Sequence, residues 1–199
     1  YLYNKYDNIY QKENESKDTT SFVVVDKNGM VVSCTNTLGE LFGSKKYVGG
    51  FFLNNSSANF NENENSINSY APKKQSRTFI SPAIITKEDD YIMGIGSPGA
   101  NSIPQVLAQV INANLRNGID LEDAVKMNRF LFDGNQVLSE EMISSDIISQ
   151  IMDDGKNYSI VQDKSKLLYG SIHAIVKDRN EGIYGISDSR RRGEYKVKY

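Results

Sequence analysis

Cysteine and histidine are nearly absent from this sequence of 199 residues, which holds one of each, Cys34 and His173. A single cysteine excludes an internal disulfide and a cysteine-rich zinc site. A single histidine excludes a histidine-based metal cluster, and any serine–histidine or cysteine–histidine catalysis would have to use that one residue. His173 lies in a segment typical of a strand, so a core or edge histidine is the favoured interpretation. We therefore expect no metal site, and catalysis, if present, must use other groups.

Strong net charge and long hydrophobic runs are also missing. The 23 lysines and arginines nearly balance the 25 aspartates and glutamates, and the net charge of −2 argues against nucleic acid as a partner. A basic excess between residues 188 and 198 is interpreted as a solvated tail. No run of about 18 apolar residues occurs, so we expect no transmembrane segment within these residues. With 39% hydrophobic and 10% aromatic residues, the chain is not globally disordered.

A β-hairpin is predicted near the start of the chain. The sequence begins without a methionine or a leader, so we expect a processed or trimmed piece. Residues 1–18 are polar, lack a steady apolar period, and are expected to be exposed. Residues 20–25 are rich in β-branched side chains, residues 26–29 contain an Asn-Gly turn, and residues 30–37 resume a strand pattern. Thr19 therefore stands between the exposed segment and the first strand.

Further strands and helices are predicted along the rest of the chain. Helical periodicity with Pro104 in the first turn predicts a helix over 103–115, and Asp120 is expected to cap a second. A third helix is expected to start at Ser139 or Ser144, with Ile147 among its inward residues, and to end at Gly155. Strands are expected at 82–86, 91–95, 158–161, 171–177 and 182–186, and a loop at 61–75. This order favours an α+β architecture with antiparallel pairing.

Thr19 is the first candidate for chemistry. A threonine hydroxyl is a poor nucleophile at neutral pH unless a base lies beside it, and the α-amine of the same residue can serve once the preceding peptide bond is broken. An α-amine titrates near about 7.7–8.0, so part of it is basic at working pH without any histidine. The alternative is that Thr19 and Thr20 simply begin a strand, where threonine is an ordinary residue.

A run of small residues, Gly96-Ser97-Pro98-Gly99-Ala100, precedes the first predicted helix. Small residues let backbone N–H groups point at an anion near a helix N-terminus, which suits a phosphate or the oxyanion of an acyl-transfer intermediate. The run lacks the Gly-Lys-Ser/Thr ending of a Walker loop and the Gly-x-Gly-x-x-Gly pattern of dinucleotide-binding loops. Taken alone, it also fits a tight turn.

Seven short motifs extend from Thr19 almost to the C-terminus. They are Thr19-Thr20-Ser21-Phe22-Val23-Val24-Val25-Asp26, Thr35-Asn36-Thr37-Leu38, Leu53-Asn54-Asn55, Ser81-Pro82, Gly96-Ser97-Pro98-Gly99, Asn128-Arg129-Phe130 and Ser187-Asp188-Ser189-Arg190. In this order they resemble the small subunit of γ-glutamyltranspeptidases, a family of N-terminal nucleophile hydrolases. The chain looks most similar to the branch that depolymerises poly-γ-glutamate capsules.

The resemblance implies a fold and a partner. The fold would be an α+β, four-layer αββα sandwich of the N-terminal nucleophile hydrolase type, completed by a large subunit of the same precursor. Residues 1–18 would be the C-terminal tail of that large subunit, and residues 19–199 would be the small catalytic subunit. Asn128, Arg129 and an ion pair between Asp188 and Arg190 would be structural. No cofactor is implied.

The resemblance also implies catalytic residues. Thr19 would attack the Asp18 carbonyl to cut the precursor, and would afterwards carry the γ-glutamyl group as an ester. The hydroxyl of Thr37 would orient Thr19. The backbone N–H groups of Gly99 and Ala100 would form the oxyanion hole, for which alanine is acceptable because only its N–H is needed.

The substrate-binding positions depart from the pattern of glutathione-cleaving members. Those members hold the free α-amino group of the substrate with polar or acidic side chains, at positions that align with Gly39, Ser56 and Asn59, and none of these three is charged. Asn55, Arg77 and Thr78 are also assigned to substrate binding, with Thr78 in place of the first of two serines before Ser81-Pro82. The loop at 61–75 is shorter than the lid of those enzymes.

The expected reaction is transfer of a γ-glutamyl group to water or to an acceptor amine. An internal unit of poly-γ-glutamate has an acylated nitrogen and needs no ammonium pocket, so this polymer is the expected substrate. The open alternatives are a glutathione γ-glutamyltransferase, a cephalosporin acylase on the same scaffold, and a catalytically inactive scaffold subunit. Members of the family are exported, so a cell-surface or extracellular location is also expected.

Overall fold

The structure is a computed structural model that describes residues 19–87, 91–152 and 158–198. Three features expected from the sequence fall outside these residues: the exposed segment and large-subunit tail at 1–18, most of the turn after the strand at 82–86, and the end of the third helix at Gly155.

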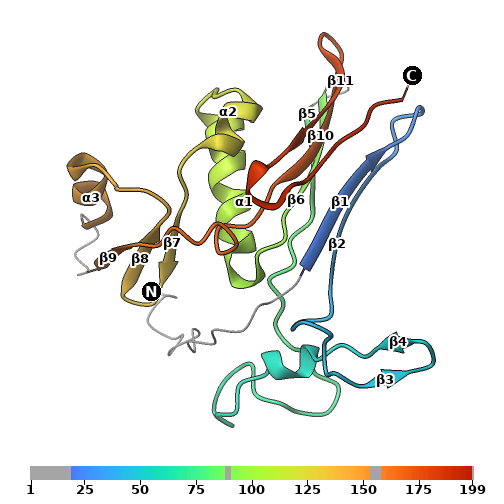
Figure 1. Ribbon diagram of the computed structural model, residues 1–199, viewed down its shortest axis with the longest axis vertical. Helices are drawn as coiled ribbons and strands as arrows, with labels where there is room; N and C mark the ends of the chain where they lie inside the picture. Colours follow the sequence, from blue (N-terminus) through green and yellow to red (C-terminus); the bar gives the residue numbers. More distant parts are fainter. Residues whose placement is uncertain (1–18, 88–90, 153–157, 199) are drawn as a thin grey trace.

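The described chain is built from a hairpin, a sheet and a helical layer. The hairpin pairs β1 (Thr19–Val25) with β2 (Val31–Thr37). The sheet has the order β11-β10-β6-β5 and is antiparallel throughout. Its strands are β5 (Ala83–Lys87), β6 (Tyr91–Gly96), β10 (His173–Asp178) and β11 (Gly182–Ser187). The hairpin lies against one face of this sheet, and α1 and α2 cover the other (Figure 1). The α+β prediction is confirmed, and the predicted antiparallel pairing holds in the hairpin and in this sheet.

Small residues on β6 bring the hairpin close to the sheet. A Cβ on Gly94 would lie 2.5 Å from a methyl group of Val23, and a Cβ on Gly96 would lie 2.3 Å from the Ser21 hydroxyl. The Ser33 hydroxyl donates a hydrogen bond to the Ile95 carbonyl oxygen across the layers at 2.8 Å. Because atoms closer than about 3 Å must shift, only glycine at these two positions allows this packing.

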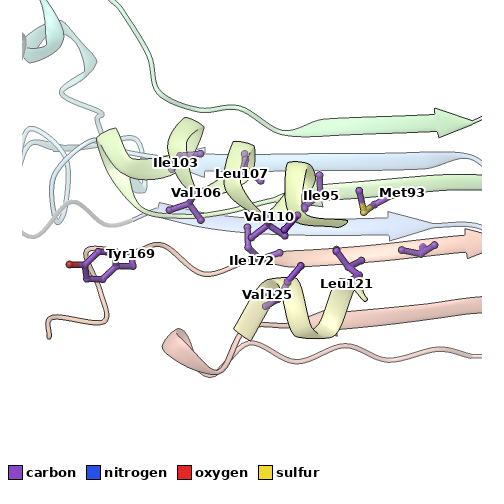
Figure 2. Packing of buried hydrophobic residues seen from close by; sticks show 14 of the residues in the cluster. Met93, Ile95, Ile103, Val106, Leu107, Val110, Leu121, Val125, Tyr169 and Ile172 are labelled. Atoms are coloured by element: carbon purple, nitrogen blue, oxygen red, sulfur yellow. The ribbon is translucent and has the colours of Figure 1, made fainter. Parts of the chain in front are cut away.

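The helical layer supplies most of the hydrophobic core. Helices α1 (Ile103–Ile111) and α2 (Leu121–Lys126) turn their apolar side chains toward β6 and β10, and Figure 2 shows this cluster with Met93 and Ile95 on the sheet. A π-helical turn, Asn112–Arg116, continues α1, so the predicted helix to about residue 115 is confirmed in extent. Asp120 caps α2 as predicted, because its carboxylate accepts from the Glu122 and Asp123 N–H groups.

Smaller elements surround these layers. They are β3 (Tyr47–Val48), β4 (Phe51–Phe52), the 3₁₀ turn Ser56–Asn59, β7 (Phe130–Asp133), β8 (Gln136–Ser139), α3 (Ser145–Met152) and β9 (Ser159–Gln162). The sequence did not predict β7 and β8. The expectation that Ile147 faces inward is wrong, because this side chain is 43% exposed and α3 contains no fully buried residue.

Candidate active site

The two predicted catalytic threonines lie directly opposite each other. Thr19 is the first residue of β1 and Thr37 the last residue of β2, and they are partners in the antiparallel ladder. The Asn-Gly turn at the other end of the hairpin sets this register, because a turn fixes which residues face each other. Both side chains are half-buried. The hairpin thus places both threonines at the end from which the chain continues toward β3 (Figure 1).

A tight turn follows Thr37. The Thr37 hydroxyl oxygen accepts a hydrogen bond from the Gly39 N–H at 2.9 Å. The Asn55 side-chain oxygen accepts from the Glu40 N–H at 3.1 Å, and the Asn55 N–H donates to the Leu38 carbonyl oxygen at 2.9 Å. Gly39 and Asn55, both predicted to bind substrate, are therefore in contact with each other and with the residues that follow Thr37.

The predicted oxyanion loop connects β6 to α1. Gly99 has φ +144° and Ala100 has φ +54°, so the loop reverses through two residues in a region that L-residues rarely adopt. The Ser102 hydroxyl donates to the Gly99 carbonyl oxygen at 2.7 Å and fixes its direction. The N–H groups of Gly99 and Ala100 thus lie at the start of a short 3₁₀ turn, Ala100–Ser102, that leads into the helix.

The segment that contains Gly170 and Ser171 packs against this loop, and the sequence did not predict this contact. The Ser171 N–H donates to the Ser97 hydroxyl at 3.0 Å. A Cβ on Gly99 would lie 3.0 Å from the Cα of Gly170, so the two glycines are packed backbone against backbone. Ser97 was visible in its motif, but nothing in the sequence placed Gly170 and Ser171 beside it.

A buried cluster of charges holds that segment in turn. Arg129 donates to Asp188 at 2.6 Å and to the Tyr169 carbonyl oxygen at 2.7 Å, and Asp188 accepts from the Ile172 N–H at 3.1 Å. Burial opposes the charged form of Asp188, but the Arg129 charge and the N–H donors outweigh it and hold the pKa of Asp188 below its ordinary value. The structural role predicted for these residues is consistent with these contacts.

Arg190 completes the cluster. Its guanidinium forms ion pairs with Asp188 at 3.2 Å and with Glu140 at 2.6 Å, and its side chain is 9% exposed. The predicted pair between Asp188 and Arg190 is therefore present. The interpretation of the C-terminal basic residues as a solvated tail is wrong for Arg190, whereas Lys196 and Lys198 are exposed.

A cavity of about 460 Å³ opens beside Thr19. It lies between β1, strands β10 and β11, and the C-terminal segment, and its wall includes Thr19, Pro98, His173, Arg191 and Lys196. The predicted nucleophile and Pro98 of the predicted oxyanion loop therefore line the same cavity, whereas Thr37, Gly99 and Ala100 lie outside its wall. His173 is half-buried on an interior strand, and burial lowers its pKa, so its imidazole is neutral near pH 7.

The other predicted binding residues lie outside the wall of this cavity. Ser56 and Asn59 form the ends of a 3₁₀ turn, and the Asn59 carbonyl oxygen accepts from Asn68 at 2.6 Å. The Arg77 guanidinium lies 5.4 Å from the centre of the Phe79 ring, and the Thr78 hydroxyl accepts from the Ile80 N–H at 3.2 Å. These side chains are placed on the segment that connects the hairpin to β5, and none of them is charged except Arg77.

Two features are absent from the described residues. Among them, no group of three or more histidine, cysteine, aspartate or glutamate side chains is arranged to hold a metal ion. No helix in the described part of the chain is long and apolar enough to cross a membrane.

Comparison with known proteins gives consistent matches. The sequence model of a family described as gamma-glutamyltranspeptidase matches residues 2–197. The capsule biosynthesis protein CapD proenzyme of Bacillus anthracis is 40% identical over 92% of this chain and 34% of its own length, and a glutathione hydrolase proenzyme of Bacillus subtilis is 29% identical over 92% of this chain. The chain spans about a third of the length of these curated relatives.

Solved structures agree with this result. A crystal structure of the Bacillus anthracis transpeptidase enzyme CapD superposes with a TM-score of 0.72 at 37% identity, covering 90% of this chain and 99% of that one. A gamma-glutamyltranspeptidase from Pseudomonas nitroreducens, complexed with L-DON, superposes with a TM-score of 0.76 at 26% identity, covering 90% and 100%. The likeness confirms the predicted fold class.

Proposed function

Because the chain belongs to the gamma-glutamyltranspeptidase family, we propose that it is the catalytic part of an enzyme that transfers γ-glutamyl groups with Thr19 as the nucleophile. The observation that carries the proposal is the position of Thr19. It starts a strand, faces Thr37 across the ladder, and lines the same cavity as Pro98 of the small-residue loop. A nucleophile, an orienting hydroxyl and backbone donors for an oxyanion are the parts that acyl transfer needs.

The proposed reaction has two steps. The free α-amine of Thr19 takes the proton of its own hydroxyl, and the oxygen attacks the γ-carbonyl carbon of the substrate. The N–H groups of Gly99 and Ala100 stabilise the oxyanion, which collapses to an ester on Thr19 as the amine product leaves with a proton. Water or a second amine then attacks the ester, regenerates the hydroxyl, and releases the γ-glutamyl group as a free acid or as the new γ-glutamyl amide.

The proposal includes a two-chain enzyme made from one precursor. Cleavage before Thr19 would free its α-amine, leave residues 1–18 on the large subunit, and leave residues 19–199 as the small subunit. Phe22, Val24 and Val32 lie on the hairpin face away from the sheet and are 44%, 50% and 47% exposed. We propose that the large subunit covers this apolar face and supplies the fourth layer of the sandwich.

Poly-γ-glutamate is the substrate that the binding positions favour. A free ammonium must lose its hydration on binding and needs charge or hydrogen bonds in return. Gly39, Ser56 and Asn59 supply no negative charge, and a side chain at position 39 would meet Asn55, since a Cβ there would lie 2.0 Å from its oxygen. An acylated nitrogen is uncharged and needs no such compensation. The proposed site of action is the cell surface or the medium, where a capsule polymer lies.

Two measurements test the proposal. The first follows the precursor by mass spectrometry. Thr19→Ala should stay uncut, because the attacking oxygen is gone. Thr19→Ser should still be cut, but more slowly, because serine lacks the methyl group that restricts the rotamer of the hydroxyl. A new N-terminus at residue 19 in the alanine variant would overturn the assignment.

The second measurement separates the substrates. We expect kcat/KM to be higher for a γ-linked glutamate oligomer than for glutathione, and to fall for the oligomer between about 0.05 and 0.5 M salt, because Lys73, Lys74 and Arg77 would attract its carboxylates. The Lys74 ammonium donates to the carbonyl oxygens of Ile67 and Ser69, and these two bonds hold it on this loop. Faster turnover of glutathione, without a salt effect on the oligomer, would favour the glutathione alternative.

A further inference from the structure

Asn55 clamps the turn that follows Thr37. Its side-chain oxygen accepts from the Glu40 N–H at 3.1 Å, and its backbone N–H donates to the Leu38 carbonyl oxygen at 2.9 Å. These two bonds hold the residues on either side of Gly39. Fifteen residues separate Asn55 from Glu40, so the clamp is a tertiary contact and does not arise from local turn geometry.

Gly39 is the residue inside this clamp. Its φ of +93° disfavours residues with a side chain, and a Cβ at this position would lie 2.0 Å from the Asn55 oxygen. Its N–H donates to the Thr37 hydroxyl oxygen at 2.9 Å. A hydroxyl has two acceptor lone pairs and one hydrogen, so this donor occupies one lone pair and restricts the direction of the hydrogen. The turn therefore fixes the side chain that faces Thr19.

We propose that Asn55 is a positioning residue that orients the Thr37 hydroxyl toward Thr19, and that it is not a ligand of the substrate. The inference rests on the proposed function, because Thr37 matters only if Thr19 is the nucleophile. The path runs from the Asn55 oxygen to Glu40, through the Gly39 N–H, to the Thr37 hydroxyl.

Cleavage of the precursor distinguishes the two roles, because it precedes substrate binding. In the full precursor, Asn55→Ala removes the acceptor for Glu40, and we expect cleavage before Thr19 to slow by about 3- to 10-fold, as for one lost hydrogen bond. The kcat of the mature enzyme should fall by a similar factor with KM unchanged. Asn55→Asp keeps an acceptor oxygen at the same place and should cleave at nearly the wild-type rate.

Asn54→Ala is the matched control. The Asn54 side-chain oxygen accepts from the Ser56 N–H at 2.9 Å and not from the Glu40 N–H, so its loss should leave cleavage unchanged. Thr37→Ala combined with Asn55→Ala should be no slower than Thr37→Ala alone, because the second change acts through the first residue. If Asn55→Ala does not fold, Gly39→Ala displaces the same oxygen and should slow cleavage in the same way.

Wild-type cleavage of Asn55→Ala, with a raised KM for the γ-glutamyl substrate, would overturn this inference and make Asn55 a substrate ligand. That result would leave the nucleophile assignment intact. The proposed function fails separately, through cleavage before residue 19 in Thr19→Ala.

Discussion

The guanidinium of Arg129 lies 2.6 Å from the carboxylate of Asp188, and both side chains are 1% exposed. Each also bonds to the segment that supports the small-residue loop, Arg129 through the Tyr169 carbonyl oxygen and Asp188 through the Ile172 N–H. A buried pair of this kind stabilises the fold only while both partners are present, because either charge alone would be buried without compensation.

Removing one partner should therefore be costly. We expect Asp188→Asn to lower the free energy of unfolding by about 3–5 kcal/mol, as measured for other broken buried pairs. Chemical denaturation of the purified protein measures this loss. Lys126→Gln is the control, since the Lys126–Glu122 pair has both side chains 63% exposed and should have no measurable effect. Equal stability of the two variants would contradict the role assigned to the buried pair.

Acidification should destabilise the protein in two stages. Burial lowers the pKa of His173 in the folded state, so the unfolded chain binds more protons as the pH falls below about 6.5. The pKa of Asp188 is also lowered, so its contribution is present above about pH 4 and is lost as the pH falls further through its folded-state pKa. Denaturation at a series of pH values should show both losses. In His173→Gln the loss that begins below about pH 6.5 should become smaller, while the loss due to Asp188 at lower pH remains.

Thr37→Ala should slow both precursor cleavage and turnover. The change removes the hydroxyl proposed to hydrogen-bond to the nucleophile, and we expect a loss of roughly 1–3 kcal/mol in transition-state stabilisation, or about 5- to 150-fold in rate. Thr37→Ser keeps the hydroxyl and should be nearly silent. The measurement is the rate of appearance of the Thr19 N-terminus, followed by kcat of the mature enzyme. Full activity of the alanine variant would remove the orienting role even if Thr19 is the nucleophile.

Gly99→Ala should lower turnover, whereas Ala100→Gly should not. In Gly99→Ala the new Cβ would lie 2.7 Å from the Ser102 hydroxyl and 3.0 Å from the Cα of Gly170, so the loop must shift. We expect at least about a 10-fold loss in kcat, since losing one oxyanion donor costs about 10²- to 10³-fold.

Ala100→Gly should be tolerated. The exchange relieves the strain of φ +54° but frees the unfolded chain, and these effects nearly cancel, within about 0.5 kcal/mol. The N–H group remains, so turnover should be close to wild type. Assays of both variants with the same substrate test the pair, and a similar loss of activity in the two would show that the backbone donors are not at these positions.

The part of the structure that could be predicted from sequence is the part fixed locally. The β-branched runs and the Asn-Gly turn predicted the hairpin, and hairpin register then placed Thr19 opposite Thr37. The missed strand β7 has a non-local origin, because the Gln109 side chain of α1 donates to the Phe130 carbonyl oxygen and accepts from its N–H. A local sequence pattern does not predict such a contact between distant segments.

The contacts that hold the candidate site in place could not be predicted from sequence for the same reason. The motif around Asn55 was recognised, and a substrate-binding role was predicted for this residue, but its contact with Glu40 joins two separate segments. Cys34 is likewise only half-buried, since it lies on the outer face of the hairpin with Phe22. Which face of a hairpin is covered depends on the layer packed against it, and periodicity alone does not reveal it.

Two adjacent threonines start the hairpin, and their side chains point to opposite faces of the strand. Successive side chains of a strand point to opposite faces, so Thr19 shares the face of buried Ser21, while Thr20 is exposed and pairs with Asn36. The two residues offer the same hydroxyl chemistry. If cleavage occurs before Thr19, the alternation of side chains along the strand determines that Thr19, and not Thr20, is the attacking residue. A slip of one residue in the pairing of β1 with β2 would place Thr20 in that position. The pairing of β1 with β2 would then determine which peptide bond is cut.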